Sequence, residues 1–356
     1  MLGAFVRRQI TGIEVVTKKK ERICMKTRKL RLLSFVLAVA MMFAVMPVSA
    51  FAAETTFEYE YMGQTLNYEV INANKSFVKL AHNENIKGDV IIPETVENNG
   101  KYYTVVEIGS DAINNGGKRW NNAPTTIKMP STITKIDSSA FNNNWSLTQI
   151  EIPASVEDIG AWAFQYCGNV TKVTFEEGSK LKTIGESAFS SCQQVKEFVV
   201  PEGVTTIGAD AFGGCYALES LVIPSTVTSI GVVSGHGLVD DNGKVVIKYN
   251  GSDDSVFNGK IPSTLKNKIA HPHNVSFVMN GHGTAPADQT VYTGDKIEKV
   301  EEPTATAEGY NFAGWYTDEG LTQKFDVEND TIPGDTTLYA KWEKIPDHQL
   351  TVTGGT

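Results

Sequence analysis

The chain has 356 residues, enough for two or three domains, and its 41% hydrophobic and 21% charged residues are ordinary for a soluble globular protein. This composition argues against an intrinsically disordered chain and against a polytopic membrane protein. The formal net charge is −9, whereas nucleic-acid binding needs a cationic surface that displaces phosphate counterions. We therefore expect no nucleic-acid partner.

Residues 1–52 are predicted to be an export signal. From Met25 a basic stretch leads into the apolar run LLSFVLAVAMMFAVMPV, and an Ala-x-Ala cleavage pattern follows at Ala50 to Ala52. An uncleaved anchor is the alternative, because the run approaches the ~17 residues that can span a bilayer, but Pro47 and the cleavage pattern favour removal. Residues 1–24 precede a complete signal, so we expect translation to start at Met25. The chain after residue 52 has 22 basic and 39 acidic residues, a net charge of −17, and no membrane association is expected beyond the export signal.

Residues 53–120 are predicted to form an N-terminal β cap and a degenerate first repeat. A repeat then runs through residues 121–232. Its isoleucines recur at spacings of 23, 25, 23 and 23 residues and its prolines form a second column: Ile136, Ile159, Ile184, Ile207, Ile230; Pro130, Pro153, Pro201, Pro224. The 25-residue unit carries two extra residues in FEEGSKLKTI, where Glu176 replaces the proline.

Each repeat unit is predicted to contain three short pieces. TQIEIP alternates like a half-buried strand that proline ends, SVEDIG supplies a second extended piece, and AWAFQYCGNV forms a tight helical or 3-10 turn. Periods in the twenties with one short strand per unit indicate a leucine-rich-repeat solenoid. We expect one phenylalanine from each unit to stack along its interior: Phe141, Phe164, Phe189 and Phe212.

The repeated residues resemble the BspA-like leucine-rich repeats, whose units read approximately L-x-x-I-x-I-P-x-x-V-x-x-I-G-x-x-A-F-x-x-C. The resemblance covers residues 125–231 and extends more loosely back to residue 86, with Ile113 in place of phenylalanine. It implies an exported or surface-bound protein that adheres to host or other-cell proteins.

The pattern decays over residues 233–272, predicted to be a degenerate C-terminal repeat and linker. Residues 273–345 contain GYNFAGWYTD and LYAKW, and their aromatic residues are expected to form a small β-rich core: Phe312, Trp315, Tyr316, Tyr339 and Trp342. This segment resembles the Listeria-Bacteroides repeat, or internalin B-repeat, a β-grasp-like stalk module of bacterial surface proteins. Residues 346–356 resemble the start of a truncated further repeat.

The predicted fold class is therefore mainly β: a leucine-rich-repeat solenoid of short strands and tight helical or 3-10 turns, followed by a small β-grasp-like domain. The two resemblances imply a protein that is secreted or held on a bacterial surface with a Gram-positive-type envelope.

The sequence predicts no catalytic, cofactor-binding or metal site. Motifs of metalloproteases, serine hydrolases, P-loop proteins and dinucleotide-binding proteins are all missing from it. His271 and His273 could supply two metal ligands, but zinc normally needs a third. The pairs Asp240–Asp241 and Asp253–Asp254 lack EF-hand spacing and sit in turn-forming sequence.

Cys167, Cys192 and Cys215 fall in one inward column, in which Asn144 fills the same position one unit earlier. A nucleophile is normally a single residue with its own base, so we predict stacked thiols that pack as small hydrophobic groups. A disulfide between neighbouring units stays open as an alternative, because units stack ~4.8 Å apart.

Two surfaces are candidates for partner binding. The outward strand positions change from mixed charge to valine along the repeat: Lys128, Glu151, Thr174, Val199 and Val222. The valines either bind a partner or are covered by the degenerate unit. The second surface contains Trp162, Tyr166 and Trp145. Trp162 occupies a position that is Ser or Asp in sister units, so we expect these aromatic side chains to be exposed unless loops fold over them. Exposed tryptophan and tyrosine are favoured anchors at interfaces.

The leading hypothesis is a non-enzymatic protein that binds an unknown extracellular protein or glycoprotein, of a host or of another bacterial surface, through its repeat face. The alternatives are the accessory part of a larger extracellular enzyme and a structural stalk without a specific ligand.

Overall fold

The computed structural model describes residues 55–84, 86–113, 124–232, 237–303 and 309–345. The predicted export signal with its start at Met25 and the predicted repeat fragment 346–356 lie outside these residues. Within the described ranges, no helix has the length and apolar character needed to cross a bilayer.

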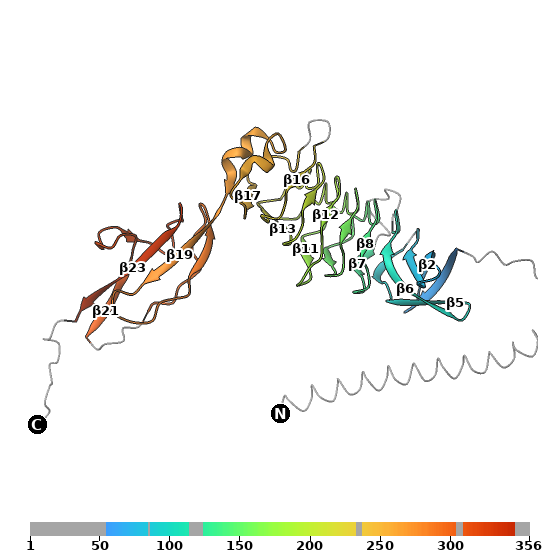
Figure 1. Cartoon of the computed structure of the whole chain (residues 1–356), viewed down its shortest axis with the longest axis horizontal. Helices are drawn as coiled ribbons and strands as arrows, with labels where there is room; N and C mark the ends of the chain where they lie inside the picture. Colours follow the sequence, from blue (N-terminus) through green and yellow to red (C-terminus); the bar gives the residue numbers. More distant parts are fainter. Residues whose placement is uncertain (1–54, 85, 114–123, 233–236, 304–308, 346–356) are drawn as a thin grey trace, which may run out of the picture. The chain divides into compact units, whose positions relative to one another are not determined.

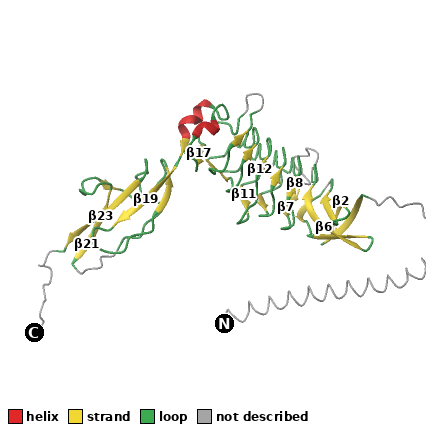
Figure 2. Cartoon of the chain, viewed as in Figure 1, coloured by secondary structure: helices red, strands yellow, loops and turns green. Residues whose placement is uncertain are grey.

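The repeat units fold as stacked coils of a β-solenoid, and the fold is mainly β with very little helix (Figures 1 and 2). One strand from every coil joins a continuous parallel column. Its strands in the regular repeats are β8 (Lys135–Ile136), β10 (Asp158–Ile159), β12 (Thr183–Ile184), β14 (Thr206–Ile207) and β16 (Ser229–Ile230). The isoleucines of neighbouring coils pair directly, so the predicted isoleucine column is confirmed.

A second column of strands, here called the strand face, runs along the other side of the coils. It consists of β4 (Gly88–Ile91), β7 (Pro124–Lys128), β9 (Gln149–Ile152), β11 (Lys172–Phe175), β13 (Glu197–Val199), β15 (Ser220–Ile223), β17 (Val246–Tyr249) and β18 (Ile269–Ala270). Its ladder is interrupted: β4 pairs with β7, β9 with β11, and β13 to β18 form a third sheet. The break between β11 and β13 coincides with the 25-residue unit.

The N-terminal cap extends the continuous column. It contains β1 (Thr56–Tyr61), β2 (Gln64–Asn72), β3 (Phe77–Leu80), β5 (Thr95–Asn98) and β6 (Lys101–Ile108). Strand β6 pairs in parallel with β8, and Tyr68 and Leu80 are buried in the same core as the repeats. The cap thereby covers an apolar end that an open solenoid would expose.

The segment after the regular repeats, for which a degenerate repeat and linker was predicted, contains regular structure. Strands β17 and β18 continue the strand face, and two short 3-10 helices lie between them: η1 (Asp254–Phe257) and η2 (Ser263–Lys268). Buried Phe257 and Leu265 belong to the solenoid core. Residues 237–270 therefore form a further coil, and η1 and η2 cover the core at this end.

The turns of the regular repeats are not helical, contrary to the prediction. Two residues in each turn have left-handed backbone conformations, such as Ser139 (φ 58°) and Asn143 (φ 63°). The amides of residues 139, 141 and 143 all donate to carbonyls of the next coil, at 2.8 to 2.9 Å. A continuous helix would direct these amides along its own axis, so bonding between coils replaces bonding within a helix.

Phenylalanine side chains stack through the interior as predicted. The ring centroids of Phe141 and Phe164 lie 5.1 Å apart, those of Phe164 and Phe189 lie 5.3 Å apart, and Phe189 and Phe212 follow at 6.2 Å. Glycine after the isoleucine lets the backbones approach: a Cβ on Gly160 would lie 2.6 Å from the Ser138 amide nitrogen.

The C-terminal domain is a five-stranded sheet in the order β20-β19-β23-β21-β22, and its described residues contain no helix. The strands are β19 (Pro272–Val278), β20 (Gln289–Tyr292), β21 (Tyr310–Tyr316), β22 (Lys324–Phe325) and β23 (Thr336–Lys344). Phe312, Trp315 and Trp342 belong to its core as predicted. Tyr316 is buried as predicted, although outside that cluster, and it pairs across β21 and β23 with Tyr339, which is only half-buried.

Replacing Phe164 with alanine is expected to lower the free energy of unfolding by about 3–5 kcal/mol, because it opens a cavity between two stacked rings. Urea denaturation followed by circular dichroism measures the change. Lys172→Ala on the exposed strand face is the control and should stay within about 0.5 kcal/mol of the unmodified chain. Equal effects of the two substitutions would contradict the interior stack.

Candidate partner-binding surfaces

The residues considered for metal binding have other roles in the structure. His271 bonds the Gly251 carbonyl through Nδ1 (3.0 Å) and faces Asp254, whereas His273 faces Asp335. Asp253 accepts the Ser255 amide at the start of η1, and this bond lowers the pKa of its carboxyl. Among the residues that the structure describes, no group of three His, Cys, Asp or Glu side chains could hold a metal ion.

Cys167, Cys192 and Cys215 are buried and form no disulfide bond. Each thiol donates to the phenylalanine carbonyl of the preceding coil: Cys167 to Phe141 (3.4 Å), Cys192 to Phe164 (3.5 Å) and Cys215 to Phe189 (3.3 Å). Asn144, in the same position one coil earlier, donates to Phe141 and to Ile113. The position therefore selects a compact side chain that can donate a hydrogen bond, which refines the prediction of a purely hydrophobic role.

Burial also makes these thiols unreactive. It raises the pKa of Cys167 and of Cys215 to about 12 and raises that of Cys192 well above the ordinary value. The thiolate is the nucleophile, so this column is no catalytic site.

The five outward positions of the strand face form one row. Lys128, Glu151 and Val199 are exposed, and Thr174 and Val222 are half-buried. Val199 is 50% exposed. The degenerate unit does not cover the valines, because β17 pairs edge to edge with β15 and continues the row.

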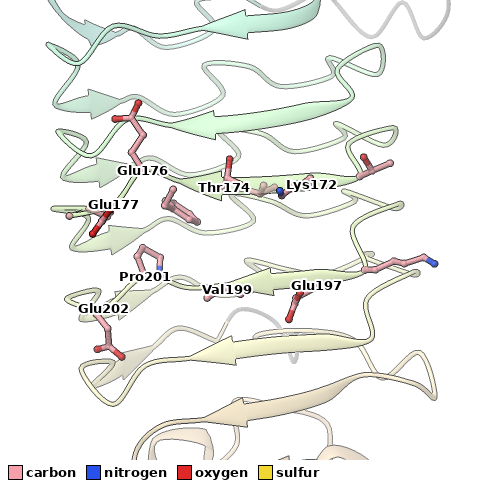
Figure 3. A pocket seen from close by; sticks show the side chains of 14 residues that line it. Lys172, Thr174, Glu176, Glu177, Glu197, Val199, Pro201 and Glu202 are labelled. Carbon is pink, nitrogen blue, oxygen red and sulfur yellow. The ribbon is translucent and has the colours of Figure 1, made fainter. Parts of the chain in front are cut away.

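A groove of about 830 Å³ opens on the strand face between β11 and β13 (Figure 3). Phe175, Val199 and Pro201 give it an apolar floor, and a smaller hollow of about 330 Å³ lies on the other side of β11. Glu176, Glu177 and Glu202 follow the ends of β11 and β13 (Figure 3). Thr174 and Val199 were predicted to belong to a binding surface, whereas the acidic residues were not, although the 25-residue spacing falls at this place.

Trp162 and Tyr166 share one turn and are exposed by 41% and 40%. Both have left-handed backbones, with φ of 58° and 60°. The corresponding residues of sister coils are small or polar: Asp111, Ser139, Ser187 and Asp210 for Trp162, and Asn143, Ser191 and Gly214 for Tyr166. A bulky residue in this conformation is an outlier that costs ~1–3 kcal/mol. These two residues are called the aromatic patch below.

Trp145 differs from the other two predicted aromatic anchors. It is half-buried, and its ring lies directly over Gly168 of the next coil, where a Cβ would clash with it. Tyr216 occupies the same repeat position as Trp145 and Gly168 but is 65% exposed. Tyr216 was not among the predicted anchors, although it falls in the same column of the repeat as Trp145.

The two parts of the chain match two known families. Residues 119–234 match the family model of the BspA type leucine rich repeat region in six copies, and residues 273–341 match the Listeria-Bacteroides repeat domain. The chain thus contains a BspA-type leucine-rich-repeat region followed by a Listeria-Bacteroides repeat domain. It is a bacterial repeat protein of the surface type.

Two proteins of Evansella cellulosilytica share short stretches with this chain. One, whose name describes a Gly-rich membrane protein, is 44% identical over 71 residues, which are 20% of this chain and 8% of the relative. The other, also named as a membrane protein, is 42% identical over 72 residues, 20% of this chain and 10% of the relative. The chain thus spans a tenth or less of these relatives.

Solved structures with similar coils include two bacterial leucine-rich repeat proteins. That of T. pallidum has 23% identity and a TM-score of 0.44, covering 57% of this chain and 90% of the other. That of Eubacterium ventriosum has 20% identity and a TM-score of 0.36, covering 52% and 46%.

The buried thiols predict a loss of stability at alkaline pH. The unfolded chain releases thiol protons near pH 8.5, whereas native Cys167 keeps its proton up to a pKa of about 12. The native state then binds more protons, so the free energy of unfolding should fall as pH rises above ~9, by about 1.4 kcal/mol per pH unit for each thiol. Urea denaturation at pH 8 and pH 10 measures this.

Cys167→Ala is the matched comparison, because it should lose less stability between the two pH values than the unmodified chain. An identical pH dependence would mean that the native thiol ionises as freely as the unfolded one.

Trp162→Ser and Tyr166→Asn restore residues that sister coils use. Each substitution loses the ~2 kcal/mol of stability that the partly buried aromatic ring contributes. It also removes a conformational cost of similar size, because the smaller residue suits the left-handed backbone. The free energy of unfolding should therefore change by less than about 1.5 kcal/mol, far less than for Phe164→Ala, as urea denaturation will show. A loss as large as that of Phe164→Ala would identify the two residues as core.

Proposed function

We propose that this protein is exported to the bacterial surface or beyond it and recognises an extracellular protein or glycoprotein without catalysing a reaction. The partner belongs to a host or to another bacterial surface. The Listeria-Bacteroides repeat domain serves as part of a stalk that displays the solenoid.

The observation that carries the proposal is the aromatic patch. Trp162 and Tyr166 keep about two fifths of their surface exposed and have a backbone conformation that suits small residues. Since sister coils fill these positions with small or polar residues, the solenoid does not need the aromatic rings. Partly exposed tryptophan and tyrosine are favoured anchors in protein interfaces, so a bound partner explains their presence.

The alternatives of an accessory part of an extracellular enzyme and of a ligand-free stalk make different demands on the patch. A stalk without a ligand has no use for exposed aromatic anchors at a cost in backbone strain. An accessory domain of an enzyme would still bind a partner, namely the substrate surface. The patch therefore favours a binding role in either context over a purely structural one.

The double variant Trp162→Ser/Tyr166→Asn should bind at least tenfold more weakly, because removing an aromatic anchor typically costs 2 kcal/mol or more. The fluorescently labelled full chain is tested against intact bacterial cells, epithelial cells and an array of extracellular glycoproteins. The control is Tyr102→Ser in the N-terminal cap, where Tyr102 is 67% exposed.

Binding by the unmodified chain that the double variant retains in full would remove the aromatic patch from the interface. Failure of the unmodified chain to bind any of these surfaces would favour the structural stalk.

A further inference from the structure

The two strands that flank the groove, β11 and β13, bond to strands on their far sides and do not pair with each other. On one side, the longer loop bonds to the preceding coil: the Glu176 amide donates to the Ile152 carbonyl (3.0 Å) and the Lys180 amide to the Ala154 carbonyl (2.9 Å). On the other side, the Val200 amide donates to the Val222 carbonyl (3.0 Å) of the following coil. Each of the two strands thus bonds to the coil on the side away from the groove, and β11 and β13 do not pair.

The floor of the groove offers apolar surface that the solenoid leaves uncovered. Val199 is 50% exposed, and Phe175 and Pro201, which also line the groove, are only partly buried. Phe175 is steadied by an edge contact with Phe198, whose ring centroid lies 6.0 Å away. A side chain that enters the groove can therefore bury apolar surface on a preformed floor.

The charges of the groove are unequally distributed. Four carboxylates line it against two ammonium groups. Glu177 and Glu202 lie at the ends of the strands that flank it, whereas the carboxylate of Glu176 points toward the preceding coil (Figure 3). The Glu176 carboxylate accepts the Ala154 amide through Oε2, at 2.9 Å. None of the salt bridges among the described residues includes a groove carboxylate; nearby Lys182 donates to the Gly203 carbonyl instead.

We propose that this groove binds an extended segment of a protein partner in which a lysine or arginine follows an apolar residue. The inference deepens the proposed function and depends on it. The aliphatic stem of the basic side chain lies over Val199 and Pro201, and its cationic end lies between Glu177 and Glu202. Long basic side chains bury their stem on apolar surface in this way while the charge stays near water. The occupant is assigned by charge complementarity to a groove with excess carboxylate.

The test measures fluorescence anisotropy of a labelled nonapeptide that alternates lysine with valine and threonine, titrated with the full chain. Two further peptides carry glutamate or glutamine in place of lysine. The lysine peptide should bind most tightly and should weaken when the salt concentration rises, because partly exposed charge pairs are screened. Glu177→Gln/Glu202→Gln should weaken its binding roughly three- to tenfold, as expected for two exposed ion pairs.

Val199→Thr copies Thr174 of the neighbouring coil and is expected to weaken the lysine and glutamine peptides alike, since it removes only apolar contact. Glu97→Gln on exposed β5 of the cap is the charge control and should leave binding unchanged. The proposal is overturned if the lysine peptide does not bind the unmodified chain, if the glutamine peptide binds as tightly, or if the Glu177/Glu202 double variant binds like the Glu97 control.

The aromatic-patch double variant separates this result from the proposed function. It should bind the lysine peptide with unchanged affinity, because Trp162 and Tyr166 lie on the turn and do not line the groove. Loss of peptide binding in the groove variants alone supports the groove. Loss of cell or glycoprotein binding in the patch variant alone supports partner recognition without the groove.

Discussion

Hydrogen bonding between the turns of successive coils is the interaction on which the solenoid depends. Three amides in each turn donate to the next coil, as Trp162, Phe164 and Tyr166 do to the carbonyls of residues 186, 188 and 190 at 2.8 to 2.9 Å. For alternate amides to point the same way, the chain passes twice through the left-handed region. The resulting coil spacing brings the phenylalanine rings to about 5–6 Å from one another and the thiols within reach of the preceding carbonyls.

The same turn ladder explains how the repeat can stop. At the C-terminal end, the Asp210 and Phe212 amides still find carbonyls, at Gly237 and Leu238. The third amide, of Gly214, is instead accepted by the Asp240 carboxylate at 2.9 Å. A side chain thus takes the place of a further turn, and β17, η1 and η2 cover the core below it. The end of the solenoid is satisfied without another regular coil, as buried backbone groups require.

Inward-facing features could be predicted from sequence because each coil repeats them. The positions of Ile159 and Phe164 hold isoleucine and phenylalanine in each regular unit, and each side chain packs against the same residue type in the next coil. The left-handed turns were not predicted, because serine and aspartate at these positions suit helix starts and turns equally well. The β-bulge between Phe312 and Gly314 shifts the register of β21 against β23, and the alternating pattern of the sequence does not reveal it. The groove depends on which coil the longer loop bonds to, and no local pattern reveals that choice.

Both proposed binding surfaces arise where one coil departs from what its neighbours need. The residues of sister coils show what each position requires for the fold. A residue that differs from them without improving an internal contact therefore needs an explanation outside the solenoid. Trp162 keeps the required backbone but adds a ring that remains two fifths exposed. Glu176 replaces a proline in a loop with two added residues, and one of the breaks in the strand ladder lies beside this loop. The first departure enlarges the turn surface and the second hollows the strand face, so recognition can be added to a repeat without altering the turn ladder that builds it.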